Sequence, residues 1–152
     1  MLNDDLSKEK SFRVLAIQEH ESISIDIEKI KAYQYDSLFF EQKAFERPMQ
    51  LFGKMTGYMQ LVFDGKVKMY RFDYLIQSTS SSKRMTNSYV QSDFYLEREN
   101  QQQMTLVRKG AFRKNIKLYF KDCPLLVEQI ELKRLKFKDL NKIIEFYNEY
   151  CE

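Results

Sequence analysis

Tryptophan is absent from this 152-residue sequence, histidine occurs once, cysteine and proline occur twice each, and glycine occurs four times. With His20 as the single histidine, general acid–base chemistry would fall to carboxylates, tyrosine or lysine. There is no Gly-rich phosphate loop, no histidine pair at helical spacing and no serine flanked by glycines. We therefore expect a protein without enzymatic activity, bound metal or other cofactor.

Long apolar runs are also missing. None approaches the roughly 18 residues needed to cross a bilayer, so we expect no transmembrane segment. The opening MLNDDLSKEK has no basic segment followed by an apolar one, and so does not resemble a signal peptide. This favours a cytoplasmic location. A periplasmic or cell-envelope location follows instead if a signal peptide was trimmed before Met1.

The charge of the chain is modest and uneven. The formal net charge is +3 and the pI is about 8.7, which argues against nucleic acid as the partner, because nucleic-acid-binding domains are usually more basic. Residues 104–152 contain eleven Lys and Arg against seven Asp and Glu, so the excess of positive charge lies in the C-terminal third.

Alternation of apolar and polar residues predicts strands along the first two thirds of the chain. In ISIDI, residues 23–27, the three isoleucines share one face, which is typical of a strand with one exposed face. The preceding SFRVLAIQ would form a hairpin with it through EHES. Two further strands are expected on either side of Asp36-Ser37.

Asp64-Gly65 is the clearest local signal. It separates two alternating runs in GYMQLVFDGKVKMYRFDY, and Asp-Gly suits the positive φ angles of a type I′ hairpin turn. Residues 77–92 are rich in Ser and Thr and predict a flexible loop. After them, DFYLERENQQQMTLVR predicts another hairpin with Asn100 near its tip.

From Gly110 onward the periodicity becomes helical. The first apolar stripe consists of Phe112, Ile116, Tyr119, Phe120 and Cys123. Asp122 stands where it would cap the next helix, and Pro124 suits the first position of that helix. A last helix has a stripe through Leu140, Ile143, Ile144, Tyr147 and Cys151.

These patterns predict an α+β fold, with a mostly antiparallel sheet of hairpins followed by about three short C-terminal helices. Residues 1–10 would be a flexible arm. Residues 11–108 would form the β body, with a flexible loop near 77–92. Residues 109–152 would form a helical segment packed on that body.

Cys123 and Cys151 allow several interpretations. If the last two helices pack antiparallel, both thiols reach the same end of the helical segment, and a disulfide requires Cα atoms within about 7 Å. A disulfide is favoured in an exported protein, and two buried thiols are favoured in a cytoplasmic one. A zinc site would need more ligands, and a nucleophile pair would need His20 to approach from a distant part of the sequence.

Basic and aromatic residues alternate in KVKMYRF. This pattern can stack on bases or sugars, and it is also typical of any half-exposed strand. Together with residues of the Ser-rich stretch it gives a candidate binding surface. The surface consists of Lys66, Lys68, Tyr70, Arg71, Lys83, Arg84 and Tyr89.

Four stretches resemble a group of uncharacterised Bacteroidota envelope and secreted proteins: IEKIKAYQYDSLFFEQKAF, YMQLVFDGKVKMYRF, LYFKDCPLLVEQI and IIEFYNEYCE. That group combines a β-rich body, which has an Asp-Gly-Lys-Val hairpin, with a helical C-terminus bearing Asp-Cys-Pro, Tyr-Asn and a nearby Cys. The matching positions are Asp64, Gly65, Lys66, Val67, Asp122, Cys123, Pro124, Tyr147, Asn148 and Cys151. This chain departs from the group in its Ser-rich stretch and in lacking the usual signal peptide.

The resemblance implies a periplasmic or envelope setting and brings no catalytic residues with it. Together with the missing catalytic motifs, it favours a non-enzymatic cell-envelope module that binds a protein or glycan partner through the sheet face or residues 77–92. The alternative is a cytoplasmic nucleic-acid-binding protein that uses the basic C-terminal helices.

Overall fold

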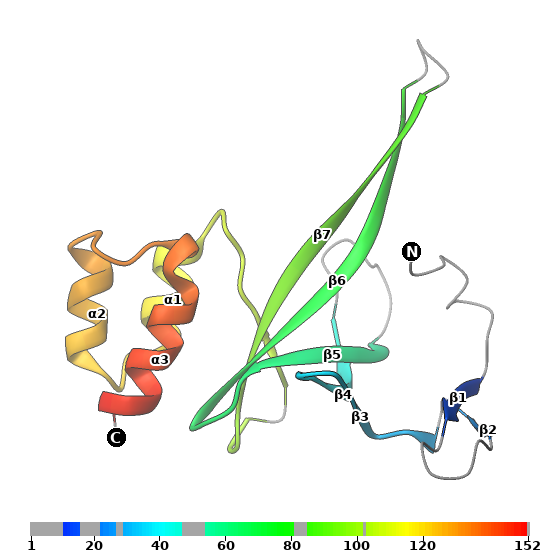
Figure 1. Ribbon diagram of the computed structural model, residues 1–152. Coiled ribbons are helices and arrows are strands. Elements are labelled where there is room, and N and C mark those ends of the chain that lie inside the picture. Colours follow the sequence, from blue (N-terminus) through cyan, green and yellow to red (C-terminus); the bar gives the residue numbers. More distant parts are fainter. Residues whose placement is uncertain are drawn as a thin grey trace.

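A computed structural model describes residues 11–15, 22–26, 29–46, 54–80, 85–101 and 103–151, which form two sheets and a C-terminal group of helices (Figure 1). The strands are β1 (Ser11–Leu15), β2 (Ser22–Asp26), β3 (Ala32–Tyr35), β4 (Leu38–Phe45), β5 (Met55–Phe63), β6 (Val67–Ser80), β7 (Met85–Arg98) and β8 (Thr105–Leu106). The helices are α1 (Phe112–Tyr119), α2 (Pro124–Glu131), the short 3₁₀ helix η2 (Phe137–Asp139) and α3 (Leu140–Tyr150). The predicted α+β fold is confirmed.

Within each sheet of the described residues, strands that are consecutive in the sequence pair antiparallel. β1 and β2 form a two-stranded sheet, and the other six strands form a second sheet in the order β3-β4-β5-β6-β7-β8. Asp36 and Ser37 connect β3 to β4, as predicted, and Asp36 has a φ of 54°, a left-handed conformation that Asp tolerates. The predicted hairpin after residue 93 also forms, since Tyr95 of β7 pairs with Leu106 of β8.

The six-stranded sheet has a cluster of buried residues on each face. On one face, Val67 and Met69 of β6 and Leu96 of β7 pack against the helices. On the other face, a second cluster consists of Phe45, Met59, Tyr70 and Tyr95. The ring centres of Phe45 on β4 and Tyr95 on β7 are 5.3 Å apart, although β5 and β6 lie between these two strands in the sheet. The sheet therefore curls around this second cluster.

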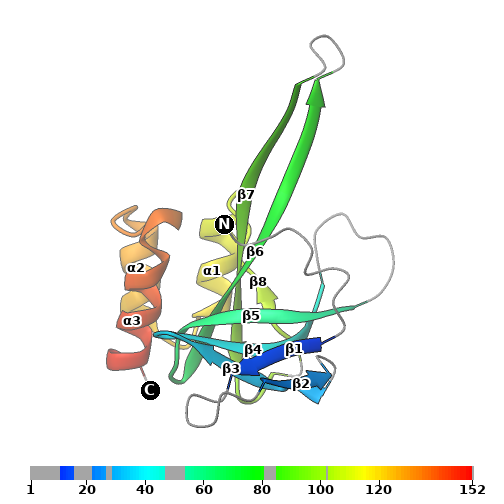
Figure 2. The same ribbon diagram turned by 45° about the vertical axis from the view of Figure 1, so that its right-hand side comes forward.

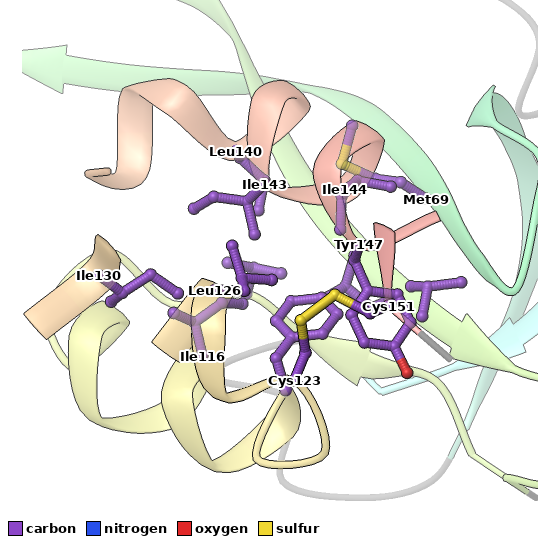
Figure 3. Packing of buried hydrophobic residues seen from close by; sticks show 14 of the residues in the cluster. Met69, Ile116, Cys123, Leu126, Ile130, Leu140, Ile143, Ile144, Tyr147 and Cys151 are labelled. Carbon is purple, nitrogen blue, oxygen red and sulfur yellow. A yellow bond between two sulfur atoms is a disulfide. The ribbon is translucent and has the colours of Figure 1, made fainter. Parts of the chain in front are cut away.

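Each helix contributes one apolar stripe to the first cluster (Figure 3). The buried helical residues are Phe112, Ile116, Leu126, Ile130, Leu140, Ile143, Ile144 and Tyr147. Fully burying an aliphatic side chain of this size stabilises the fold by roughly 1.5–3 kcal/mol. Helices of 8 to 11 residues are too short to be stable alone, so their packing on one another and on β6 holds them in place.

Residues 77–92 are not the loop that their composition predicts. β6 continues to Ser80 and β7 begins at Met85, and their residue pairs run without interruption from Val67 and Arg98 to Ser80 and Met85. Among the described side chains of this segment, Asp73, Leu75, Gln77 and the residues 88–90 are exposed, so polar residues are tolerated there. Without a buried face, the apolar alternation that identifies a strand is weak.

The predicted hairpin at Asp64-Gly65 forms, but the prediction of a type I′ turn was wrong. The connection from Phe63 to Val67 contains three residues, and neither Asp64 nor Gly65 has a left-handed φ. Glycine is needed at position 65 for a different reason. A Cβ there would lie 2.6 Å from the side-chain nitrogen of Asn148 on α3, so the turn and the helix approach too closely for any side chain.

Pro124 begins α2 as predicted, whereas Asp122 does not cap that helix. The residue before Pro124 is Cys123, which takes the N-cap position and forms no side-chain capping bond. The carboxylate of Asp122 is directed to Arg98 and Tyr147 instead. A charged partner and a phenol hydroxyl therefore replace the backbone amides that the sequence pattern suggested.

Candidate functional site

Cys123 and Cys151 form a disulfide between the start of α2 and the end of α3, with a Cα–Cα distance of 5.6 Å (Figure 3). Both residues are buried, at 5% and 3% exposure. Of the interpretations left open by the sequence, the structure contains the disulfide, and the described residues include no free cysteine. His20, the proposed partner of a nucleophile pair, lies outside the described residues.

The disulfide adjoins the contact between α3 and the β5–β6 connection. The Asn148 side chain bonds to both backbone groups of Val67: its oxygen accepts from the amide at 2.9 Å, and its nitrogen donates to the carbonyl at 3.0 Å. The Lys66 ammonium donates to the carbonyl of Cys151. These bonds join the end of α3 to the β5–β6 connection in one structural junction.

Arg98 of β7 fastens the same end of the helices to the sheet. Its guanidinium donates to both oxygens of Asp122, at 2.8 and 3.1 Å, and to the carbonyl of Tyr119 at 2.7 Å. The hydroxyl of Tyr147 also donates to Asp122. The pKa of Asp122 is lowered to about 2, mainly by the hydrogen bonds from Arg98. Burial raises the pKa of Tyr119 to about 12. At neutral pH Asp122 is therefore an anion, and its bonds hold β7 and α3 together.

A second polar cluster lies on the curled face of the sheet. The Lys43 ammonium contacts carboxylate oxygens of Glu41 at 3.0 Å and Glu97 at 2.8 Å, and the Tyr70 hydroxyl donates to the same two groups at 2.7 and 3.2 Å. Burial alone would raise the pKa of Glu41, but the bonds from Tyr70 and Lys43 outweigh it and lower the pKa. Burial and the bond to Glu41 raise the pKa of Tyr70.

This cluster has the residue types of an acid–base site, but its arrangement is that of a satisfied ionic network. One ammonium and one hydroxyl are shared between two carboxylates, and the Lys43 ammonium also lies 4.7 Å from the Tyr70 ring centre. Both carboxylates accept from these donors. The network can hold β4 and β7 together across the curled sheet.

The residues of the predicted binding surface are not all at the surface. Tyr70 was predicted wrongly, because it is completely buried among Phe45, Met59 and Tyr95, and its hydroxyl is satisfied by the two glutamates. Lys68 forms an ion pair with Asp64 at 3.3 Å, and Arg71 forms one with Asp73 at 3.1 Å.

Of the remaining surface residues, Lys66 is exposed and bonded to Cys151, and Tyr89 is exposed at 54%. Lys83 and Arg84 lie outside the described residues. Among the described members of the set, Tyr89 is therefore the exposed side chain that belongs neither to the junction nor to an ion pair.

Tyr89 belongs to a feature that the sequence did not reveal. Beyond Arg71, β6 leaves its pairing with β5, and before Tyr95, β7 does not yet pair with β8. The segments 72–80 and 85–93 therefore form a two-stranded hairpin that projects from the rest of the molecule in both views (Figures 1 and 2). We refer to these segments as the projecting hairpin.

The projecting hairpin exposes apolar side chains. Leu75 and Val90 are opposite one another in the strand register and are 42% and 64% exposed, and Tyr89 stands next in the sequence. At the base, the Ser92 hydroxyl donates to Asp73 at 2.6 Å, and the rings of Phe72 and Tyr74 stack with centres 5.9 Å apart.

Comparison with protein-family models, curated proteins and solved structures finds no significant match to this chain. The described residues contain no group of three or more His, Cys, Asp or Glu placed to hold a metal ion. Within the same part of the chain, no helix has the length and apolar character required to cross a membrane. The projecting hairpin, with its exposed apolar side chains, is the candidate site.

Proposed function

We propose that this protein is a non-enzymatic cell-envelope module that binds a protein partner through the projecting hairpin. The observation that carries the proposal is the pair of strand edges beyond Arg71 and before Tyr95, which no described strand covers. A two-stranded hairpin is at best marginally stable in water on its own, and an open edge readily accepts a further strand.

A protein segment fits this site better than a glycan does. An extended chain can pair its backbone N–H and C=O groups with a strand edge, and the apolar side chains beside that edge then supply specificity. Leu75 and Val90 form such an apolar pair on one face of the hairpin, and Tyr89, on the opposite face, offers a rigid aromatic contact of the kind enriched at protein interfaces. The polar residues along the rest of the hairpin keep it soluble before binding.

The Cys123–Cys151 disulfide supports the envelope setting. Disulfides persist in oxidising compartments such as the periplasm and are rare in the cytosol, where thiols are kept reduced. The positions that resemble Bacteroidota envelope proteins also gather around this bond, at Gly65, Asp122 and Asn148. Compartment and resemblance therefore point the same way.

Site-specific photocrosslinking in cells that naturally make the protein tests the binding site. A crosslinking amino acid at Val90 is expected to yield a discrete protein adduct. The same amino acid at Leu125 on α2, which is equally exposed at 64%, is the matched control and is expected to yield none. Adducts of the same mass from both positions would contradict the proposal, and so would an adduct that is removed by glycan cleavage and resists protease.

Competition gives a second readout. Excess unlabelled wild-type protein is expected to suppress the Val90 adduct. The Leu75→Thr/Val90→Thr variant is expected to compete poorly, because threonine keeps the strand propensity but removes the exposed apolar surface. Equal competition by both proteins would show that the hairpin side chains do not contact the partner.

A further inference from the structure

A second surface, separate from the projecting hairpin, is strongly basic. A groove of about 500 Å³ lies between the start of α1 and the segment that precedes α3, and it is lined by nine residues. These are Lys109, Gly110, Ala111, Phe112, Arg113, Lys114, Leu135, Lys136 and Phe137. Four of the nine are basic and none is acidic. We refer to this feature as the basic groove.

Packing brings the two basic segments together. The rings of Phe112 and Phe137 meet edge to face with centres 5.4 Å apart, which fixes the start of α1 against η2. In Figure 1, the connection between α2 and α3 lies at the end of the helical group opposite the C-terminus, and therefore away from the disulfide. The groove is thus distinct from the junction of Arg98, Asp122 and Tyr147.

The four basic side chains have no acidic partner among the described residues. Lys109, Arg113, Lys114 and Lys136 are all exposed, and none belongs to an ion pair. The nearest acidic residue in the sequence, Asp139, accepts from the backbone amide of Lys136 at 3.1 Å. Like charges gathered around one concavity repel one another, and a bound anion would remove that repulsion.

The geometry points to a binding site for a small organic phosphate monoester. A phosphate monoester carries a charge of about −1.5 to −2 and three strong acceptor oxygens, which suits a groove lined by several Lys and Arg donors better than a single carboxylate does. Phe112, Leu135 and Phe137 give the groove an apolar floor for the organic part. A volume of about 500 Å³ is within the range of small-molecule sites.

The same observations disfavour a nucleic acid. A polynucleotide follows an extended basic track, with several backbone phosphates bound in succession. The exposed surfaces of the helices beyond the groove contain acidic residues, which interrupt such a track. They are Glu128 and Glu131 on α2 and Glu145 and Glu149 on α3. A compact basic groove with an apolar floor fits one phosphoryl group and its substituent.

Calorimetric titration of the full-length protein at low salt tests the site, because screening weakens exposed charges. Phenyl phosphate is expected to bind at one site per chain and more tightly than inorganic phosphate. In the Lys109→Gln/Lys136→Gln variant the affinity should fall by about tenfold or more, since each lost charge-assisted bond is among the stronger contacts. The Lys121→Gln/Lys142→Gln variant removes the same charge elsewhere and should bind within about twofold of wild type.

Further titrations separate the sources of the phosphate. Vesicles of phosphatidylcholine containing phosphatidic acid present the same monoester on a lipid. If the protein binds these vesicles more tightly than phenyl phosphate, and the Lys109→Gln/Lys136→Gln variant does not bind them, the ligand is a lipid headgroup. If phenyl phosphate binds and the vesicles do not, the ligand is a free ester. The proposal is overturned by no saturable binding of either probe, by equal loss in both variants, or by binding of duplex DNA alone.

Discussion

Asp122 illustrates how one side chain can join elements distant in the sequence. Its carboxylate receives the guanidinium of Arg98 from β7 and the hydroxyl of Tyr147 from α3, while it stands itself before α2. Because these donors stabilise the charged form, the pKa of Asp122 falls from its ordinary 3.8 to about 2. The anion thus contributes to folding, and that contribution depends on pH.

The Asp122→Asn variant should reveal this dependence. A carboxyl whose pKa is lower in the folded state stabilises the fold fully above its ordinary pKa, and the contribution is lost as the pH falls through the folded value. The difference in free energy of unfolding between wild type and variant should therefore be largest above about pH 4 and shrink toward pH 2. Urea unfolding between pH 2 and pH 6 measures it.

Tyr147→Phe provides the comparison. It removes the hydroxyl bond and keeps the Arg98 pair, the largest cause of the shift, so it should retain most of the pH dependence. A difference between wild type and Asp122→Asn that stays constant over this pH range would show that the carboxylate does not stabilise the fold through its charge.

Gly65 is fixed by the residue it faces. In Gly65→Ala the new methyl group would displace the Asn148 side chain and break its two bonds with Val67, which we expect to reduce the free energy of unfolding by about 1–3 kcal/mol. In a protein that already carries Asn148→Ala, the further change Gly65→Ala should reduce the free energy of unfolding by less than about 1 kcal/mol, because the clash and the two bonds are then absent. Urea unfolding of the two single variants and the double variant measures the coupling. Strictly additive effects would show that the two residues do not act through this contact.

At the scale of elements, the disulfide is a covalent link between two short helices. It closes a loop of sequence separation 28, which in the chain-entropy model stabilises the fold by about 3–4 kcal/mol. The Cys123→Ser/Cys151→Ser variant should lose about that much stability, and wild type under reducing conditions should behave in the same way. Urea unfolding with helical circular dichroism as the signal measures both.

Thiol labelling provides an independent check on the bond. Protein purified from an oxidising compartment should add no alkylating groups when it is denatured without reductant, and two when it is reduced first. Labelling of both cysteines without reductant would show that the disulfide is absent, and the proposed envelope setting would then lose its structural support.

The projecting hairpin should be the least protected part of the described sheet. The described side chains of residues 75–77 and 88–90 are outside both buried clusters, whereas Val67, Met69 and Leu96 of the same strands belong to one cluster and Tyr70 and Tyr95 to the other. Local opening requires less free energy where few apolar contacts are broken. Hydrogen–deuterium exchange should therefore be faster in the outer segments by at least about tenfold, and equal protection along both strands would contradict this expectation.

For the whole molecule, what the sequence could predict depends on the range of the interactions involved. The α+β order, the hairpins at Asp36-Ser37 and Asp64-Gly65 and the start of α2 at Pro124 follow from local preferences, and all are present. The convergence of Cys123 and Cys151 follows from two helical stripes of suitable length. These features require knowledge of neighbouring residues and little else.

The features that escaped prediction depend on contacts across the fold. The Asn148 side chain lies against Gly65 and leaves no room for a Cβ there. The carboxylate of Asp122 accepts from Arg98 and does not cap α2. In both cases the partner comes from a distant part of the chain. Tyr70 resembles a surface residue between two basic ones until the curl of the sheet places β4 glutamate and lysine side chains above it. The projecting hairpin was missed because a strand pair without a buried face has no strong periodic signal.

The curled sheet also determines how the molecule should unfold. Met69 faces the helices and Met59 faces the second cluster, and both are fully buried. Because β6 contributes Val67 and Met69 to one cluster and Tyr70 to the other, the two clusters share one backbone. Met69→Ala and Met59→Ala should each reduce the free energy of unfolding by about 2–5 kcal/mol, in a single transition.

Two signals distinguish cooperative from separate unfolding. Far-ultraviolet circular dichroism follows the helices, and near-ultraviolet circular dichroism follows the packed tyrosines, of which Tyr70 and Tyr95 lie in the second cluster. In wild type and in both variants the two transitions should coincide in urea, since loss of either cluster exposes the shared strand. If Met59→Ala shifts the tyrosine transition and leaves the helical one at the wild-type midpoint, the sheet and the helical group are separate folding units.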